Sequence, residues 1–215
     1  MKKTQITVIG GGTGSFTALL GLKKYPVYLR AIVTMMDDGG SSGRLRDELG
    51  VLPPGDIRQC IIALAKSTML LRDLFNYRYT IGDLKGHSFG NIFLSTLEKQ
   101  TGSIKKAIKV VGKILNIKGE VIPVTYDKAT LCVELDNGKI VKGEHHIDIS
   151  DNIEERNSIK KAFLSPQPKP SEDALIAIDK SDFIIIGPGD LYTSIIPNLL
   201  VPDIISHLKK TKAKI

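Results

Sequence analysis

The pattern of hydrophobic and polar positions predicts strands that alternate with helices. Residues 5–9 alternate and are β-branched, and residues 27–34 form a second apolar, β-branched run. Between these runs, the leucines and alanines of residues 18–22 follow the spacing of an amphipathic helix. Residues 183–186, Phe-Ile-Ile-Ile, are apolar without interruption, which predicts a strand that is buried on both faces. We therefore predict an α/β fold with a doubly wound, mainly parallel sheet.

Further helices are predicted over residues 70–79, 103–115 and 171–180. Two more helices are predicted to begin at the N-cap residues Asp56 and Ser88. Between residues 119 and 150 the pattern changes. Residues 121–124, 129–135 and 140–142 predict antiparallel strands, with an Asn-Gly turn at 137–138 and a continuation through 145–149. We assign residues 119–150 to a small antiparallel β-hairpin insert within a single domain that spans residues 1–215.

The last stretch, residues 203–215, predicts a helix followed by the first residues of another strand. Only three parallel strands are clearly indicated, which is few for a doubly wound sheet. We therefore expect a carboxyl-terminal part beyond residue 215.

Composition narrows the class of protein. A chain of 215 residues with 42% apolar residues has enough hydrophobic side chains for a core. It contains no apolar run of membrane-spanning length and no secretory signal, so we expect no membrane span and a cytoplasmic location. Cys60 and Cys132 are far apart and have no histidine at the spacing of zinc ligands, so we expect both to be thiols in the core. The adjacent residues His145 and His146 are expected on the surface, because neighbouring strand residues face opposite ways.

The net charge of +7 suits an anionic partner, which is either a phosphorylated small molecule or nucleic acid. Aromatic residues make up only 6% of the chain, tryptophan is absent, and the lysines form no stripe interleaved with aromatic residues. We therefore expect a small nucleotide ligand and no nucleic acid. We also expect a homo-oligomer, namely a dimer.

The first glycine-rich turn follows the first predicted strand and begins a helix. Such a turn lets backbone N–H groups approach a diphosphate at the positive end of the helix. The third glycine of the dinucleotide fingerprint is replaced by Ser15, and similar turns also serve only to pack a helix on a strand. The candidate phosphate ligands are Gly10, Gly11, Gly12, Thr13 and Gly14.

The second such region, residues 36–46, follows the second predicted strand. It has no large apolar side chain to bury between residues 37 and 44, which predicts an exposed functional loop. Asp37 lies 23 residues after Gly14, where a dinucleotide fold places its ribose-binding acid; alternatively, Asp37 or Asp38 holds Mg²⁺. Adjacent carboxylates point different ways, so we expect one to reach the ligand and the other to cap the loop.

Two helix starts add polar candidates. Arg58 lies in the first turn of a predicted helix, where a cation opposes the helix dipole, so its partner is either a carboxylate or a ligand phosphate. His87, Ser88 and Asn91 gather at another helix start beside glycines, which is either anion-binding geometry or an ordinary cap with an exposed histidine.

The last glycine turn, residues 187–194, follows the strand predicted at 183–186. Loops after the carboxyl ends of two parallel strands converge on one crevice, so we expect residues 10–15 and 187–190 to lie together. The candidate ligand residues of this turn are Gly187, Pro188, Gly189, Asp190 and Thr193.

Together, these motifs resemble the gluconeogenesis-factor family of bacteria, which shares a superfamily with the 2-phospho-L-lactate transferases. The resemblance rests on residues 8–14, 37–46, 53–58, 86–91 and 186–194 and covers essentially the whole chain. Members of that family continue well past residue 215. The resemblance implies a Rossmann-like nucleotide-binding fold. It also implies a UDP-sugar, or alternatively NAD(P), as ligand and a role in cell-wall synthesis and cell shape on gluconeogenic carbon.

Three hypotheses follow. In the first, the chain is a regulatory protein that binds a nucleotide sugar without catalytic turnover. Asp37 binds the ribose or an ion, and Ser88 and Asn91 contact the sugar or the distal phosphate. Ser41, Ser42 and Arg58 complete this ligand-binding set. In the second, the chain is a Mg²⁺-dependent phospho-group transferase, with Asp37, Asp38, Arg44 and His87 as the catalytic candidates and Arg58 as a further cation near the phosphate. In the third, it is a dehydrogenase.

Overall fold

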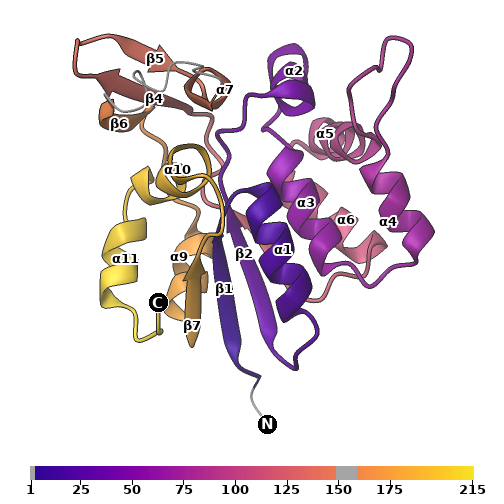
Figure 1. The fold of residues 1–215 in the computed structure, drawn as a ribbon. Coiled ribbons are helices and arrows are strands. Elements are labelled where there is room, and N and C mark those ends of the chain that lie inside the picture. Colours follow the sequence, from indigo (N-terminus) through magenta and orange to yellow (C-terminus); the bar gives the residue numbers. More distant parts are fainter. Residues whose placement is uncertain (1–2, 149–158) are drawn as a thin grey trace.

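The computed structural model describes residues 3–148 and 159–215 and contains a central parallel sheet (Figure 1). The strand order is β3-β2-β1-β7, and every pair in this sheet is parallel. The strands are β1 (Gln5–Gly10), β2 (Tyr28–Val33), β3 (Glu120–Pro123) and β7 (Phe183–Ile186). The prediction of a mainly parallel α/β sheet is confirmed.

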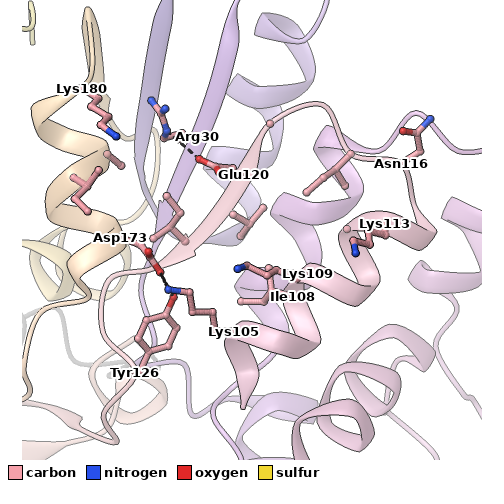
Figure 2. A pocket seen from close by; sticks show the side chains of 17 residues that line it. Arg30, Lys105, Ile108, Lys109, Lys113, Asn116, Glu120, Tyr126, Asp173 and Lys180 are labelled. Carbon is pink, nitrogen blue, oxygen red and sulfur yellow. Dashed lines mark hydrogen bonds and ion pairs between the residues drawn. The ribbon is translucent and has the colours of Figure 1, made fainter. Parts of the chain in front are cut away.

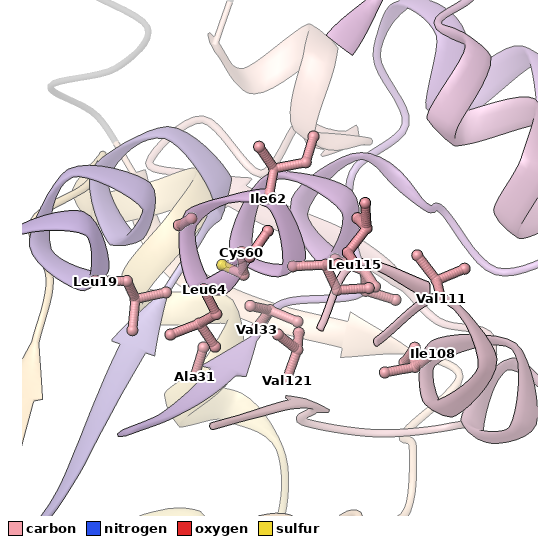
Figure 3. Packing of buried hydrophobic residues seen from close by; sticks show 14 of the residues in the cluster. Leu19, Ala31, Val33, Cys60, Ile62, Leu64, Ile108, Val111, Leu115 and Val121 are labelled. Atoms are coloured by element: carbon pink, nitrogen blue, oxygen red, sulfur yellow. The ribbon is translucent and has the colours of Figure 1, made fainter. Parts of the chain in front are cut away.

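One face of this sheet is covered by α1 (Gly12–Leu22), α3 (Gly55–Leu64) and α6 (Ile104–Ile114). The buried side chains of α3 lie over Ala31 and Val33 of β2 and Val121 of β3, with Leu19 of α1 beside them (Figure 3). Cys60 is part of this core, and Cys132 is buried elsewhere, so the expectation of two core thiols is confirmed.

The opposite face is covered by α9 (Glu172–Asp179) and α11 (Ile204–Lys210) and by a second sheet. Ile9 and Ile32 point to this face, whereas their neighbours Val8, Ala31 and Val33 point to the first. Strand geometry sends successive side chains to opposite faces, so the continuous apolar stretches at residues 8–9 of β1 and 31–33 of β2 fill two cores at once.

The second sheet is antiparallel, with the order β5-β4-β6, and is formed by β4 (Thr130–Leu135), β5 (Ile140–Lys142) and β6 (Ile159–Ser165). The predicted antiparallel pairing around the Asn-Gly turn is confirmed, but the prediction that residues 121–124 belong to it is wrong. β3 pairs in parallel with β2, because its apolar residues Val121 and Ile122 each fill one of the two cores.

Residues 145–149 are predicted to continue the β structure, and for residues 145–148 this prediction is wrong. They form the short helix α7 (Glu144–Asp148), which buries Ile147 against the second core. His145 and His146 are both exposed, as expected. The predicted segment ends at residues 149 and 150, which lie outside the described residues.

The prediction of an exposed loop over residues 37–44 is wrong from Gly40 onward. Residues Gly40–Leu49 form α2, and the small side chains of Ser41 and Ser42 are each only 4% exposed. A Cβ atom at Gly43 would clash with the Asp38 carbonyl oxygen, so the glycine allows the helix to pack closely on the preceding chain. The run buries small polar residues instead of apolar ones, which a hydrophobicity pattern does not detect.

The remaining helices are α4 (Met69–Asn76), α5 (Phe89–Thr101), the π-helical turn η1 (Leu191–Ile195) and α10 (Ile196–Leu200). As predicted, Ser88 caps α5 and Ser171 caps α9. The predicted N-cap at Asp56 is wrong, because α3 begins at Gly55 and Asp56 lies within its first turn.

The carboxyl-terminal residues begin another parallel pairing beside β7, as predicted. Lys214 forms a parallel bridge with Phe183, and its carbonyl oxygen accepts from the Ile184 N–H at 2.8 Å. The prediction that β7 is buried on both faces is wrong in the described chain, because Phe183 is 43% and Ile186 37% exposed. Within residues 3–148 and 159–215, the helices are too short or too polar to cross a bilayer.

Candidate functional site

The candidate site lies where the neighbouring strands β2, β1 and β7 end. A Cβ atom at Gly14 would collide with the Pro188 carbonyl oxygen, and one at Gly11 would lie 2.6 Å from Ser194 Oγ. The turn at residues 10–15 and the turn at 187–194 are therefore in direct contact, and their predicted convergence is confirmed. Open α/β sheets bind ligands at this edge.

Asn198, from α10, holds the two glycine turns together. Its Nδ2 donates to the Gly10 carbonyl oxygen at 3.1 Å and to the Ser194 carbonyl oxygen at 2.8 Å. Among the described residues, the Oδ1 atom of Asn198 and the Oγ atom of Ser15 are buried and have no hydrogen-bond partner. An unsatisfied buried polar atom costs about 1–3 kcal/mol, so these two atoms favour a ligand or solvent at this junction.

The amino end of α1 offers backbone donors to an anion. Its N-cap, Gly11, makes no side-chain capping bond, and the first turn contains no acidic residue. One donor is used, because the Gly12 N–H donates to the carboxyl group of Asp56. The other first-turn N–H groups add to the positive end of the helix dipole.

Two carboxyl groups approach each other beside this turn. Asp37 accepts from the Gly39 N–H at 3.0 Å and from Ser42, and burial raises its pKa above 3.8. Burial, followed by the negative charge of Asp37, raises the pKa of Asp56 to about 7. The sequence pattern indicated Asp56 only as a helix cap, although it follows a Pro-Pro-Gly run that places α3 against the site.

Asp38 turns away from this pair. Its Oδ1 accepts from the His145 N–H at 2.8 Å, and its Oδ2 lies 3.9 Å from Arg46 Nη1. The structure thus places Asp37 where it interacts with Asp56 and engages Asp38 with α7 and Arg46. This division agrees with the geometric argument that adjacent carboxylates point different ways.

A second cluster of predicted residues forms a buried hydrogen-bond network between α2, α3 and α5. Ser41 Oγ lies 3.0 Å from His87 Nδ1 and accepts from Asn91 Nδ2 at 3.2 Å. Arg58 Nε donates to Asn91 Oδ1 at 2.9 Å, and Arg58 Nη1 donates to Asn76 Oδ1 at 2.8 Å. The partners of Arg58 are therefore amide oxygens, rather than the carboxylate or phosphate considered from the sequence.

His87 and Arg58 respond differently to this environment. His87 is 5% exposed, not a surface residue, and burial, together with the charge of Arg44, lowers its pKa below 6.5. Its imidazole is neutral at pH 7 and supplies no positive charge. Burial lowers the pKa of Arg58 to about 10, so this side chain remains a cation.

The other candidates lie at the rim or within turns. Arg44 Nη2 donates to the Lys85 carbonyl oxygen at 2.7 Å and fixes the segment that precedes α5. Asp190 Oδ1 accepts from the N–H groups of Tyr192 and Thr193 and from the Thr193 hydroxyl group, so it caps η1. Thr13 Oγ1 donates to Gln59 Oε1 at 3.3 Å.

The protein-family model described as 2-phospho-L-lactate transferase CofD matches residues 6–215. The chain belongs to this family. Within it, the curated gluconeogenesis factor of Bacillus subtilis is 46% identical over 215 residues, and that of Halalkalibacterium halodurans is 45% identical over 216 residues. These alignments cover 99% and 100% of the chain but 66% of each relative. The resemblance to the gluconeogenesis-factor branch of the CofD-like proteins is confirmed.

A crystal structure of protein BH3568 from Bacillus halodurans has the same fold, with a TM-score of 0.93 and 46% sequence identity. The alignment covers 99% of the chain described here and 67% of that chain. The chain thus spans about two thirds of the length of these CofD-like relatives.

The pH dependence of stability tests the position of Asp56. A carboxyl group whose pKa is raised on folding binds more protons in the folded state, so stability falls as pH rises through the interval between the two pKa values. We expect the midpoint temperature of unfolding to decrease as the pH is raised from about 4 to about 7. At pH 8, we expect an Asp56→Asn variant to be more stable than the parent chain. Thermal melts of both proteins at each pH would measure this, and parallel curves would contradict it.

Proposed function

We propose that the chain binds a nucleoside diphosphate sugar, namely a UDP-sugar, at the junction of the glycine turns. The observation that carries this proposal is the contact between the turn at residues 10–15 and the turn at 187–194, beside the amino end of α1, whose N-cap residue Gly11 makes no side-chain hydrogen bond. Backbone N–H groups there suit a diphosphate, because they hydrogen-bond to it without a counterion. In this proposal, the carboxyl groups of Asp37 and Asp56 accept hydrogen bonds from sugar hydroxyl groups.

In this proposal the protein is regulatory. It senses the nucleotide sugar and supports cell-wall synthesis and cell shape during growth on gluconeogenic carbon. The link to gluconeogenic growth is supported by the names of the relatives, which are called gluconeogenesis factors. Support also comes from the polar network of Ser41, His87, Asn91 and Arg58. Although Ser41 Oγ lies 3.0 Å from His87 Nδ1, all four residues are at most 7% exposed and bond to one another, so this pair is not presented to a substrate.

Calorimetric titration with UDP-N-acetylglucosamine tests the ligand and the role of Asp37. We expect saturable binding that weakens at least about tenfold in an Asp37→Asn variant, because a charged hydrogen bond contributes about 1.5–3 kcal/mol. Asp47→Asn is the matched control, since Asp47 is 68% exposed and pairs only with Arg46 among the described residues. The absence of heat with millimolar UDP-sugar, or equal weakening in both variants, would contradict the proposal.

The electrostatic interaction between the carboxyl groups of Asp37 and Asp56 favours a second candidate, a Mg²⁺-dependent transferase of phosphorus-containing groups. Mg²⁺ is often held by one or two carboxylates together with substrate phosphates. Within the described ranges no three His, Cys, Asp or Glu side chains gather into a metal site, so the ligand phosphates would have to complete the coordination. In this candidate, binding in the titration above requires Mg²⁺; equal affinity with and without Mg²⁺ contradicts it.

A further inference from the structure

A cavity of about 670 Å³ lies along β3 at the other end of the sheet from β7, between α6 and α9 (Figure 2). The glycine turns do not line it. Its floor is formed by residues 119–122, and its walls come from the sides of the two helices. The volume is within the range of small-molecule sites, about 300–1,000 Å³.

Positive charge is concentrated on the wall formed by α6. Lys105, Lys109 and Lys113 recur every four residues, so they share one face of the helix, and all three line the cavity. Lys180, at the carboxyl end of α9, lines it from the opposite side. Lysines from two helices therefore surround one space (Figure 2).

The acidic residues of the cavity do not neutralise this charge. Glu120 pairs with Arg30 at 3.0 Å, and Asp173 pairs with Lys105 while accepting from the Tyr126 hydroxyl group at 2.9 Å. In the part of the chain that is described, Lys109, Lys113 and Lys180 form no ion pair within 4.0 Å, so the lining carries unpaired positive charge. Arg30 Nη1 is also buried without a hydrogen-bond partner among these residues.

The lining also includes apolar surface, from Ile108, Ile117 and Ile176. Such a mixture suits a carbon skeleton that carries anionic groups better than it suits a bare ion. An added peptide strand is disfavoured, because β3 has only four residues and Pro123, its last, has no N–H group to offer.

We propose that this cavity binds a small organic phosphate with at least two negative charges, at a site separate from the glycine turns. Lys109, Lys113 and Lys180 contact its phosphate groups, and the isoleucines contact its carbon skeleton. Because the site includes both α6 and α9, its occupant bridges the helices that cover opposite faces of the sheet.

Glucose 1,6-bisphosphate serves as the probe, with glucose as the neutral control. Its affinity for the 215-residue chain is measured by calorimetry at low ionic strength. We expect the Lys109→Gln/Lys113→Gln variant to bind at least about tenfold more weakly. The matched control is Lys99→Gln/Lys106→Gln, which removes the same charge from exposed lysines outside the cavity, and we expect less than a twofold change.

Acetylation of lysines by acetic anhydride, mapped by mass spectrometry, locates the probe. Protection confined to the cavity lysines supports the proposal, because a phosphate bound only at the glycine turns leaves them reactive. Equal loss of affinity in the two double variants, absence of binding, or uniform protection overturns it. Protection by a glutamate decapeptide but not by the bisphosphate also overturns it, in favour of an acidic peptide.

Discussion

Replacing Gly14 by alanine is expected to destabilise the chain and to abolish nucleotide-sugar binding. In an ordinary helix this change stabilises, since alanine has a higher helix propensity than glycine by about 1 kcal/mol. Here the added Cβ atom would overlap the Pro188 carbonyl oxygen, which is part of the backbone and cannot move aside as a side chain can. The two glycine turns would separate, and the ligand site between them would open.

Gly21 provides a matched control in the same helix. A Cβ atom there meets nothing within 4 Å, so Gly21→Ala should stabilise the chain and raise the unfolding midpoint by about 2–4 °C. In thermal melts, the changes in stability of the two variants should have opposite signs. In calorimetry with UDP-N-acetylglucosamine, Gly14→Ala should show no binding, whereas Gly21→Ala should bind. If Gly14→Ala is as stable as Gly21→Ala, the turns are not in the contact described here.

The second large effect is expected for Arg58→Ala. This change leaves the oxygens of Asn91 and Asn76 without their donors and opens a space at a side chain that is only 7% exposed. The buried Asn91 oxygen left without a donor costs about 1–3 kcal/mol, and the lost packing of the Arg58 side chain adds to this, so the unfolding midpoint should fall by roughly 5–10 °C. Chemical denaturation at pH 7 would measure the loss.

Arg78→Ala is the control, because Arg78 is exposed and donates to the Gly86 carbonyl oxygen. We expect a loss of at most about 1 kcal/mol. Arg58→Lys should fall between the two, since lysine keeps the charge but cannot donate to both amide oxygens in the guanidinium geometry. Equal stability of Arg58→Ala and Arg78→Ala would show that the network contributes little to folding.

Much of the α/β architecture could be predicted because apolar periodicity is a local property. The β-branched run at residues 27–34 and the unbroken run at 183–186 can bury their side chains only in a strand with a covered face. The glycine turns could also be located, since a run of glycines directly after a strand allows few other structures. Their meeting followed from the rule that parallel strands end at a common edge.

The same local logic failed where burial does not depend on apolar side chains. Residues 40–43 lack hydrophobic groups, yet they form the start of α2, because Ser41 bonds to His87 and Asn91 from distant parts of the chain. Residues 145–148 were misassigned for a related reason, since only Ile147 is anchored in the core and one apolar residue sets no period.

By itself, the sequence determined the strands β1, β2, β4 and β7, the glycine turns, the acid after β2 and the family, because each depends on residues that are neighbours in the chain. Only the tertiary structure decided that Asp56 interacts with Asp37, that Asp38 is engaged elsewhere, and that lysines from α6 and α9 line one cavity. Asp37 and Asp56 are far apart in sequence, as are the lysines of α6 and α9. Asp37 and Asp38 are adjacent, but their side chains point in different directions. Their distances are therefore set by how the helices pack on the sheet, which no local pattern specifies.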